Sequence, residues 1–183
     1  MIVETYQSKY VLRILKSGEI YRAKPNLTLR GEYAALIDML GLKCECPIFG
    51  VVKGKKKKTF GKVSGSVKLI LDVPDKFVRL TEFSEWADFL YAYKFTKPGN
   101  YRSLLPGCEE VSDRRLAEII ANLKQQKKVS AYKSPQVVLE KINPVWLKHY
   151  QLLPAASVDG GFFGWLKQKF RNANCNNKLD TPW

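Results

Sequence analysis

Residues 46–73 read CPIFGVVKGKKKKTFGKVSGSVKLILDV and decide how the chain is expected to fold. Two apolar segments, 46–52 and 67–73, flank a connection that is rich in lysine, glycine and serine. β-Branched and aromatic residues favour strands, whereas glycine and serine favour a loop between them. The pattern predicts a β-hairpin whose tip, residues 53–66, is a flexible basic loop.

This loop carries much of the charge of the protein. The chain has 183 residues, with 31 Lys and Arg against 17 Asp and Glu, and a net charge of +14. Residues 53–68 contain seven lysines and no acid, which is half of that net charge. A focused excess of charge creates a binding field, and lysines neutralise phosphates, so the pattern favours contact with nucleic acid. A solvated loop that only keeps the protein soluble is the alternative.

The composition is that of a globular protein and not of a disordered basic tail. Hydrophobic residues make up 45% of the chain and aromatic residues 12%, enough for a core of ordinary domain size. No stretch approaches the roughly 20 apolar residues of a membrane-spanning helix, and charges interrupt the first 30 residues. Four cysteines are too few and too irregularly spaced for a disulfide framework. We expect a cytoplasmic protein with reduced thiols and no transmembrane segment.

The N-terminal half combines expected strands and helices. In chain order they are strands at 2–6 and 19–23 around a helix capped by Ser8, a helix over Tyr33, Leu36, Ile37 and Leu40 that Gly41 ends, the hairpin, a strand at 77–80 and a helix capped by Ser84. The predicted fold class is α+β, with a mixed N-terminal sheet, flanking helices and the basic hairpin in one domain, residues 1–97.

After the Pro-Gly-Asn breaker at 98–100, the sequence favours helices. Ser112 is expected to cap a helix with an apolar stripe formed by Leu116, Ile119, Ile120 and Leu123. Ser-Pro at 134–135 and Asn-Pro at 143–144 place a cap residue before a proline, which predicts two further short helices. Residues 101–153 are therefore expected to form a smaller helical subdomain. The aromatic and basic tail, 154–183, is expected to be partly flexible.

Motifs for common catalytic chemistry are missing from the sequence. His149 is the only histidine, and Cys44 and Cys46 do not have the usual spacing of a zinc site. There is no phosphate-binding loop, nucleophile elbow or dinucleotide fingerprint. Acidic residues such as Asp75 and Asp113 are explained by turn chemistry and by the helix dipole. We expect neither a metal ion nor a cofactor.

Three local motifs resemble those of an uncharacterised family of bacterial and phage proteins. Residues 5–7, Thr-Tyr-Gln, are similar to a Thr-x-Gln start, residues 47–50, Pro-Ile-Phe-Gly, to a Pro-Ile-Trp-type strand, and residues 82–86, Glu-Phe-Ser-Glu-Trp, to a late Asp-Phe-x-x-Trp motif. Phe49 and Glu82 stand where the family has Trp and Asp. The resemblance covers about the first half of the chain. It implies an α+β fold and a bacterial or phage setting, and no particular activity.

The main prediction is a basic, non-enzymatic protein that binds DNA or RNA, alone or within a host nucleoprotein complex. A phage-type inhibitor of a host nucleic-acid machine, such as a defence system, fits this description. The expected contacts lie on the basic loop and on the helical region after it, at Lys53, Lys55, Lys56, Lys57, Lys58, Phe60, Lys62, Arg114, Arg115, Lys124, Lys127, Lys128 and Lys133.

The alternative prediction is an enzyme of the ADP-ribosyl-transfer type. The order of a strand, a helix and a strand with a late glutamate is loosely similar to small ADP-ribosyl-transfer enzymes. In those enzymes an early polar residue, aromatic residues and a glutamate hold the nicotinamide cofactor. The candidates here are Gln7, Tyr21 and Glu82. The competing interpretation is structural, with Tyr21 in the core and Glu82 as a charge at a helix start.

Overall fold

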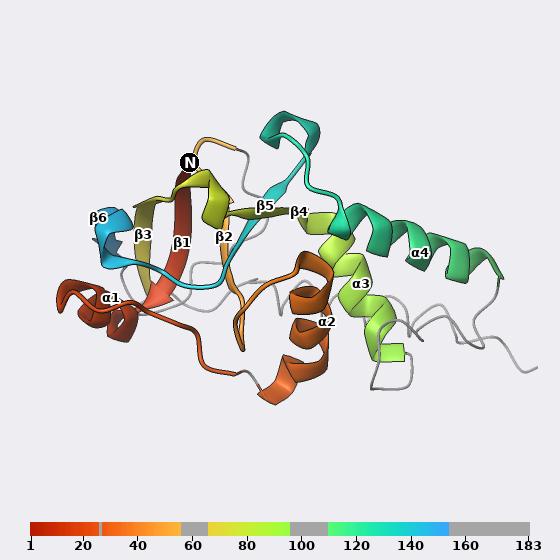
Figure 1. The fold of residues 1–183 in the computed structure, drawn as a ribbon, viewed down its shortest axis with the longest axis horizontal. Helices are drawn as coiled ribbons and strands as arrows, with labels where there is room; N and C mark the ends of the chain where they lie inside the picture. Colours follow the sequence, from red (N-terminus) through yellow and green to blue (C-terminus); the bar gives the residue numbers. More distant parts are fainter. Residues whose placement is uncertain (26, 56–65, 96–109, 154–183) are drawn as a thin grey trace, which may run out of the picture.

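The computed structural model describes residues 1–25, 27–55, 66–95 and 110–153 (Figure 1). Its centre is a six-stranded antiparallel sheet in the order β4-β5-β2-β1-β3-β6. The elements are β1 (Ile2–Ser8), α1 (Lys9–Lys16), α2 (Arg30–Leu40), β2 (Ile48–Val52), β3 (Ser66–Asp72), β4 (Arg79–Glu82), α3 (Phe83–Phe95), α4 (Glu110–Lys124), β5 (Pro135–Leu139) and β6 (Leu147–Leu152), with short 3-10 helices at Leu27–Leu29, Asp75–Phe77, Val129–Ala131 and Pro144–Trp146. The expected α+β class is confirmed, although the sheet is antiparallel and not mixed.

The two strands predicted around the lysine-rich segment are present, but they do not form a hairpin. β1 lies between β2 and β3 and pairs antiparallel with both. β2 ends where Val52 pairs with Val3, whereas β3 begins where Ser66 pairs with Ser8. The connection that starts at Lys53 therefore has to reach the other end of β1, about 17 Å away. The prediction of a basic hairpin is wrong, because the pattern of one strand does not say which strand lies beside it.

Local signals are followed at α1 and α2, whereas the caps predicted at Ser84 and Ser112 are wrong, because both residues lie inside their helices, which begin at Phe83 and Glu110. Ser8 is the N-cap of α1, where its Oγ accepts a hydrogen bond from the Val11 N–H at 3.4 Å. α2 ends at Gly41, whose φ of 62° is the left-handed conformation that glycine adopts without strain. The strand expected at 19–23 is reduced to one bridge between Tyr21 and Ile142.

The C-terminal part adds two strands to the same sheet instead of forming a helical subdomain. β5 pairs with β2 and β4, and β6 pairs with β3. Pro135 is the first residue of β5, a position where a strand tolerates the missing N–H. The β-branched pair Val137 and Val138 packs on opposite faces of the sheet, which suits a strand buried on both sides. Only Pro144–Trp146, capped by Asn143, keeps the helical conformation predicted there.

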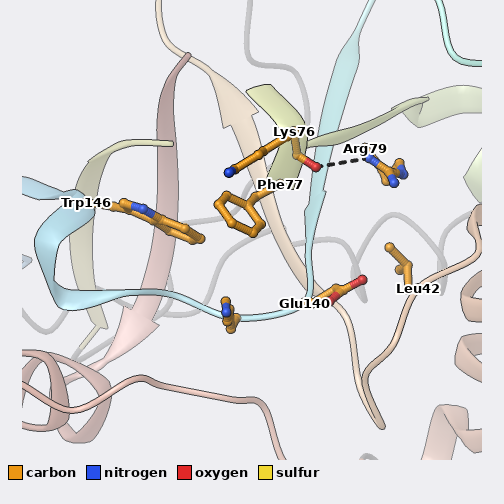
Figure 2. A pocket seen from close by; sticks show the side chains of 7 residues that line it. Leu42, Lys76, Phe77, Arg79, Glu140 and Trp146 are labelled. Carbon is orange, nitrogen blue, oxygen red and sulfur yellow. Dashed lines mark hydrogen bonds between the residues drawn. The ribbon is translucent and has the colours of Figure 1, made fainter. Parts of the chain in front are cut away.

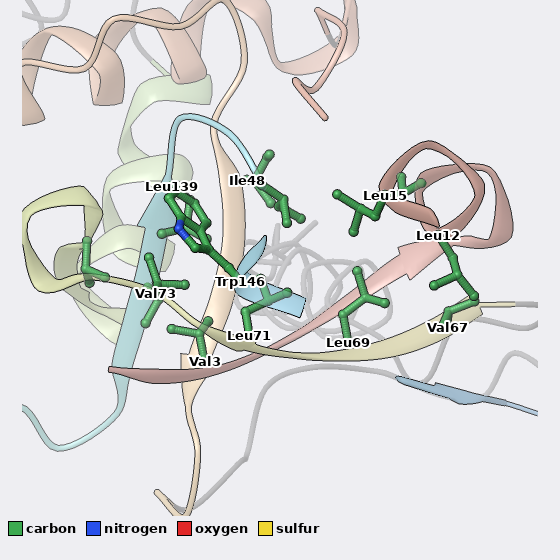
Figure 3. Close-up of a cluster of buried hydrophobic side chains, with 14 of the residues drawn as sticks. Val3, Leu12, Leu15, Ile48, Val67, Leu69, Leu71, Val73, Leu139 and Trp146 are labelled. Atoms are coloured by element: carbon green, nitrogen blue, oxygen red, sulfur yellow. The ribbon is translucent and has the colours of Figure 1, made fainter. Parts of the chain in front are cut away.

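The sheet is covered on both faces. On one face α2, α3 and α4 pack around Leu36, Phe89 and Leu123. On the other face α1 packs against β1 and β3, together with the connections 73–78 and 140–146. Figure 3 shows Leu12 and Leu15 of α1 and Trp146 of the second connection over this face. Leu36 and Leu40 of α2 and Leu116, Ile119 and Leu123 of α4, which belong to the predicted apolar stripes, are therefore core positions.

β1 and β2 come unusually close at Gly50. A Cβ at this position would lie 2.8 Å from the Val3 Cγ1 and 3.0 Å from the Glu4 carbonyl oxygen. Next to it, the Thr5 hydroxyl donates a hydrogen bond to the Phe49 carbonyl at 2.6 Å, beyond the two residue pairs that β1 forms with β2. Glycine is therefore required by the space between the strands and not by its backbone angles.

Gly50→Ala should lower the free energy of unfolding by about 1–3 kcal/mol, because the added methyl group overpacks the contact with Val3. Gly50→Ser should lower the free energy of unfolding further, because the serine hydroxyl must also fit between the strands. Urea denaturation followed by circular dichroism measures both effects. Equal unfolding midpoints for the wild type and Gly50→Ala would contradict the close approach.

Candidate nucleic-acid interface

Five exposed lysines lie at one end of the sheet. β2 ends and β5 begins at this end, because Val51 pairs with Gln136. Two of the lysines follow β2 and three precede β5, so both groups leave the sheet on the same side (Figure 1). We call this group the lysine end, and its members are Lys53, Lys55, Lys127, Lys128 and Lys133.

The loop before β5, which carries three of these lysines, is attached to the edge strand β4. The Gln126 side chain accepts a hydrogen bond from the Leu80 N–H at 2.9 Å and donates one to the Leu80 carbonyl at 3.1 Å. The Tyr132 hydroxyl accepts from the Lys127 N–H at 3.0 Å and donates to the Gln125 carbonyl at 3.1 Å. Burial raises the pKa of this phenol, which therefore stays a neutral donor. The lysines are thus presented on a supported loop.

Glu82 supports the same loop from the end of β4. Its carboxylate accepts hydrogen bonds from the backbone N–H groups of Lys133 at 2.8 Å and Ser134 at 3.0 Å. Charge-assisted bonds of this kind hold a loop strongly. They give Glu82 a structural task, which is to place Lys133 at the start of β5.

The three residues considered for ADP-ribosyl transfer are not brought together. Gln7 lies in β1 and Glu82 in β4, and β5 and β2 separate these strands. Three strand spacings amount to about 14 Å. The Gln7 amide donates to the Thr5 hydroxyl at 2.8 Å, and Tyr21 pairs with Ile142 on the face of the sheet that carries α1. No shared pocket for a cofactor follows from these positions.

Arg115 has a different environment from the lysine end. Its guanidinium lies 3.5 Å from the Glu85 carboxylate, 3.8 Å from that of Asp88 and 3.7 Å from that of Glu118. These contacts link α3 and α4 and balance the positive charge. Among the residues that the structure describes, no carboxylate lies within 4.0 Å of an ammonium group of the lysine end. A phosphate would have to replace the carboxylates at Arg115, whose role as a nucleic-acid contact stays a prediction.

The remaining predicted contacts are placed only in part. Lys124 is the last residue of α4 and is exposed beside the loop before β5. Arg114 lies on α4, but its side chain is outside the described ones. Outside the described residues lie Lys56, Lys57, Lys58, Phe60 and Lys62.

A second group of cations was not predicted from the sequence. Lys76, Arg79 and Lys141 line a small, shallow hollow of about 40 Å³ together with Phe77 and Trp146 (Figure 2). The two connections that supply these residues are far apart in the sequence. The only local signal is the exposed aromatic Phe77 between charged residues in a turn, and it does not reveal which residues join it.

Other chemistry has little support in the described part of the chain. No three His, Cys, Asp or Glu side chains within it lie close enough together to hold a metal ion. His149 is exposed on β6 and stacks beside Tyr150, so it lies on a strand and not on the helix expected there. No helix within the same ranges is both long and apolar enough to cross a membrane.

No protein-family model matches the sequence, and no curated protein or solved structure shows significant similarity to it.

Cys44 should react slowly with alkylating reagents. Burial, followed by the nearby Glu140 charge, raises the pKa of its thiol to about 11. The raised pKa keeps the thiol protonated, so at pH 8 the alkylation rate should be about 100-fold below that of an ordinary thiol and should rise up to pH 11. Iodoacetamide labelling followed by peptide mass spectrometry measures the rate, with urea-unfolded protein as the control. Rapid labelling of native Cys44 at pH 8 would contradict this environment.

Proposed function

We propose that this protein binds DNA or RNA through the lysine end and does not catalyse a reaction on it. The observation that carries the proposal is that five exposed lysines without a carboxylate partner among the described residues share one end of the sheet. Lys56, Lys57 and Lys58 continue directly from Lys55 and add charge to the same connection. The partner is therefore expected to be a polyanion.

The physical basis is the release of counterions from phosphates. Each lysine that neutralises a phosphate frees a condensed cation, so binding weakens steeply as salt rises. Lysine is a compact, strongly hydrated charge on a long stem, and it offers little of the planar, bidentate geometry that arginine uses for bases. The lysine end is therefore suited to phosphate contact without strong sequence preference.

The lysine end differs from basic positions such as Arg115 and Lys148 in having no ion pair with a carboxylate within the described residues. A cation that already faces carboxylates, such as Arg115, would have to give up these contacts to bind a phosphate. Lys148 is likewise 3.5 Å from the Asp72 carboxylate. The ammonium groups of the lysine end have no such competitor within the described residues.

We further propose that the protein is a phage-type inhibitor that acts on a host nucleoprotein complex. The motif resemblance supports the phage setting, and the basic charge supports the kind of target. A small protein with a phosphate-binding end suits this role, because it can occupy the nucleic-acid path of a larger machine. Pull-downs from host lysate with and without nuclease would separate contact through nucleic acid from contact through protein.

Lys127→Ala/Lys128→Ala/Lys133→Ala should weaken nucleic-acid binding and lower the slope of log K against log salt by about one unit per lysine, since three phosphate contacts are lost. The matched control, Lys9→Ala/Arg13→Ala/Lys24→Ala, removes the same charge from exposed positions outside the lysine end and should change the slope much less.

Fluorescence anisotropy titrations at several salt concentrations measure these slopes with labelled single-stranded and duplex DNA and RNA. Equal losses in the two triple variants would show that only the overall charge matters, and not the lysine end. Absence of binding to every probe at low salt would refute the proposed function.

A further inference from the structure

We infer that the hollow around Phe77 binds one base of a single-stranded nucleic acid, with the adjoining phosphates on Lys76, Arg79 and Lys141. The inference rests on the proposed function and specifies the form of nucleic acid that the protein prefers. Its basis is an exposed aromatic ring surrounded by cations, the combination with which proteins hold single strands.

The ring of Phe77 packs against Trp146 and keeps part of its surface exposed to solvent. Its centroid is 5.2 Å from that of Trp146, at an interplanar angle of 39°. Trp146 is only 5% exposed, whereas Phe77 is 37% exposed. The buried indole thus anchors a phenyl ring that keeps part of its surface in solvent, as a stacking platform requires (Figure 2).

Two ammonium groups lie close to this ring. The Lys76 Nζ is 5.2 Å and the Lys141 Nζ 5.4 Å from the ring centroid. These cation–π contacts are weak at exposed sites, about 0.5–1 kcal/mol, so a base can displace them. The displaced ammonium groups would then be free to meet the phosphates on either side of the base.

Arg79 is held at the rim of the hollow. Its Nη1 donates hydrogen bonds to the carbonyl oxygens of Lys76 at 3.4 Å and Val78 at 3.2 Å. The one acidic side chain of the hollow, Glu140, accepts a hydrogen bond from the Lys43 N–H at 3.0 Å. Within the described residues, no carboxylate forms an ion pair with any of the three cations of the hollow. Its charge therefore favours an anionic ligand.

The connection 73–78, which carries Lys76 and Phe77, leads from the lysine end of the sheet to the start of β4 at its opposite end. β3 ends at the same end of the sheet as β2, because Asp72 pairs with Ile2 and Val52 with Val3. Arg79 pairs with Val138, and Lys141 follows the last residue of β5, so these two cations lie at the end of β5 opposite the lysine end, about 14 Å from it. A single strand that contacts both sites must therefore run along the face of the sheet over this length. In a duplex both faces of a base are already stacked, so only a single strand can offer a base to the ring.

The test compares three labelled probes with equal numbers of phosphates: a thymidine oligonucleotide, the same strand with abasic sites, and a duplex. Phe77→Leu keeps an apolar side chain against Trp146 but removes the flat ring. It should weaken binding to the thymidine strand about tenfold and leave the abasic strand and the duplex unchanged. Phe77→Trp should restore binding. The control is Tyr10→Leu, which removes an aromatic that is 52% exposed on α1 and should have no effect.

Lys141→Ala provides a second test that does not depend on the packing of Phe77. It should lower the salt slope for the thymidine strand by about one unit. If the wild type binds no nucleic acid, the proposed function and this inference both fail. If the wild type binds the thymidine strand, and both Phe77→Leu and Lys141→Ala bind it as tightly as the wild type does, only the inference is overturned. Equal losses on all three probes would likewise overturn the stacking contact.

Discussion

β1 pairs with β3 along seven residues and approaches β2 at Gly50, and this central position of the first strand sets the layout of the protein. With β1 between them, β2 and β3 run in the same direction. β4 and β5 then lie beyond β2, and β6 lies beyond β3. The connections from β3 to β4 and from β5 to β6 therefore cross the same face of the sheet, where they form part of its core. The Phe77–Trp146 contact joins these two crossings.

This layout places some cations beside carboxylates and others where no described carboxylate lies nearby. Arg115 forms ion pairs between α3 and α4, and Lys68 forms one with the buried Glu4 at 3.2 Å. Lys53 and Lys55 are exposed after β2, and the three lysines before β5 are exposed on a loop that Gln126 and Glu82 hold in place. A formal charge of +14 is thus less informative than the subset of cations that has no carboxylate nearby.

Much of the local structure could be predicted. The cap at Ser8, the stop at Gly41 and the apolar stripe of α4 depend on residues within one or two helical turns, so their signals are readable along the chain. The Ser-Pro and Asn-Pro pairs predict helices in the segment 135–152, whereas the structure has strands there. A cap signal is local and does not show that β2 and β3 each offer an edge with which a further strand can pair. Of the candidate site, the lysines were found, and the hollow around Phe77 was missed.

By itself, the sequence determined the α+β class, the start of α1, the end of α2 and the concentration of lysine between two apolar strands. These follow from side-chain periodicity, capping and composition, which are local properties. Only the tertiary structure decided that β1 separates β2 from β3, that Glu82 serves a loop, and that Lys141 meets Phe77. Such neighbours are selected by the burial of apolar faces and by the pairing of backbone groups across long stretches of chain, and no local pattern records that selection.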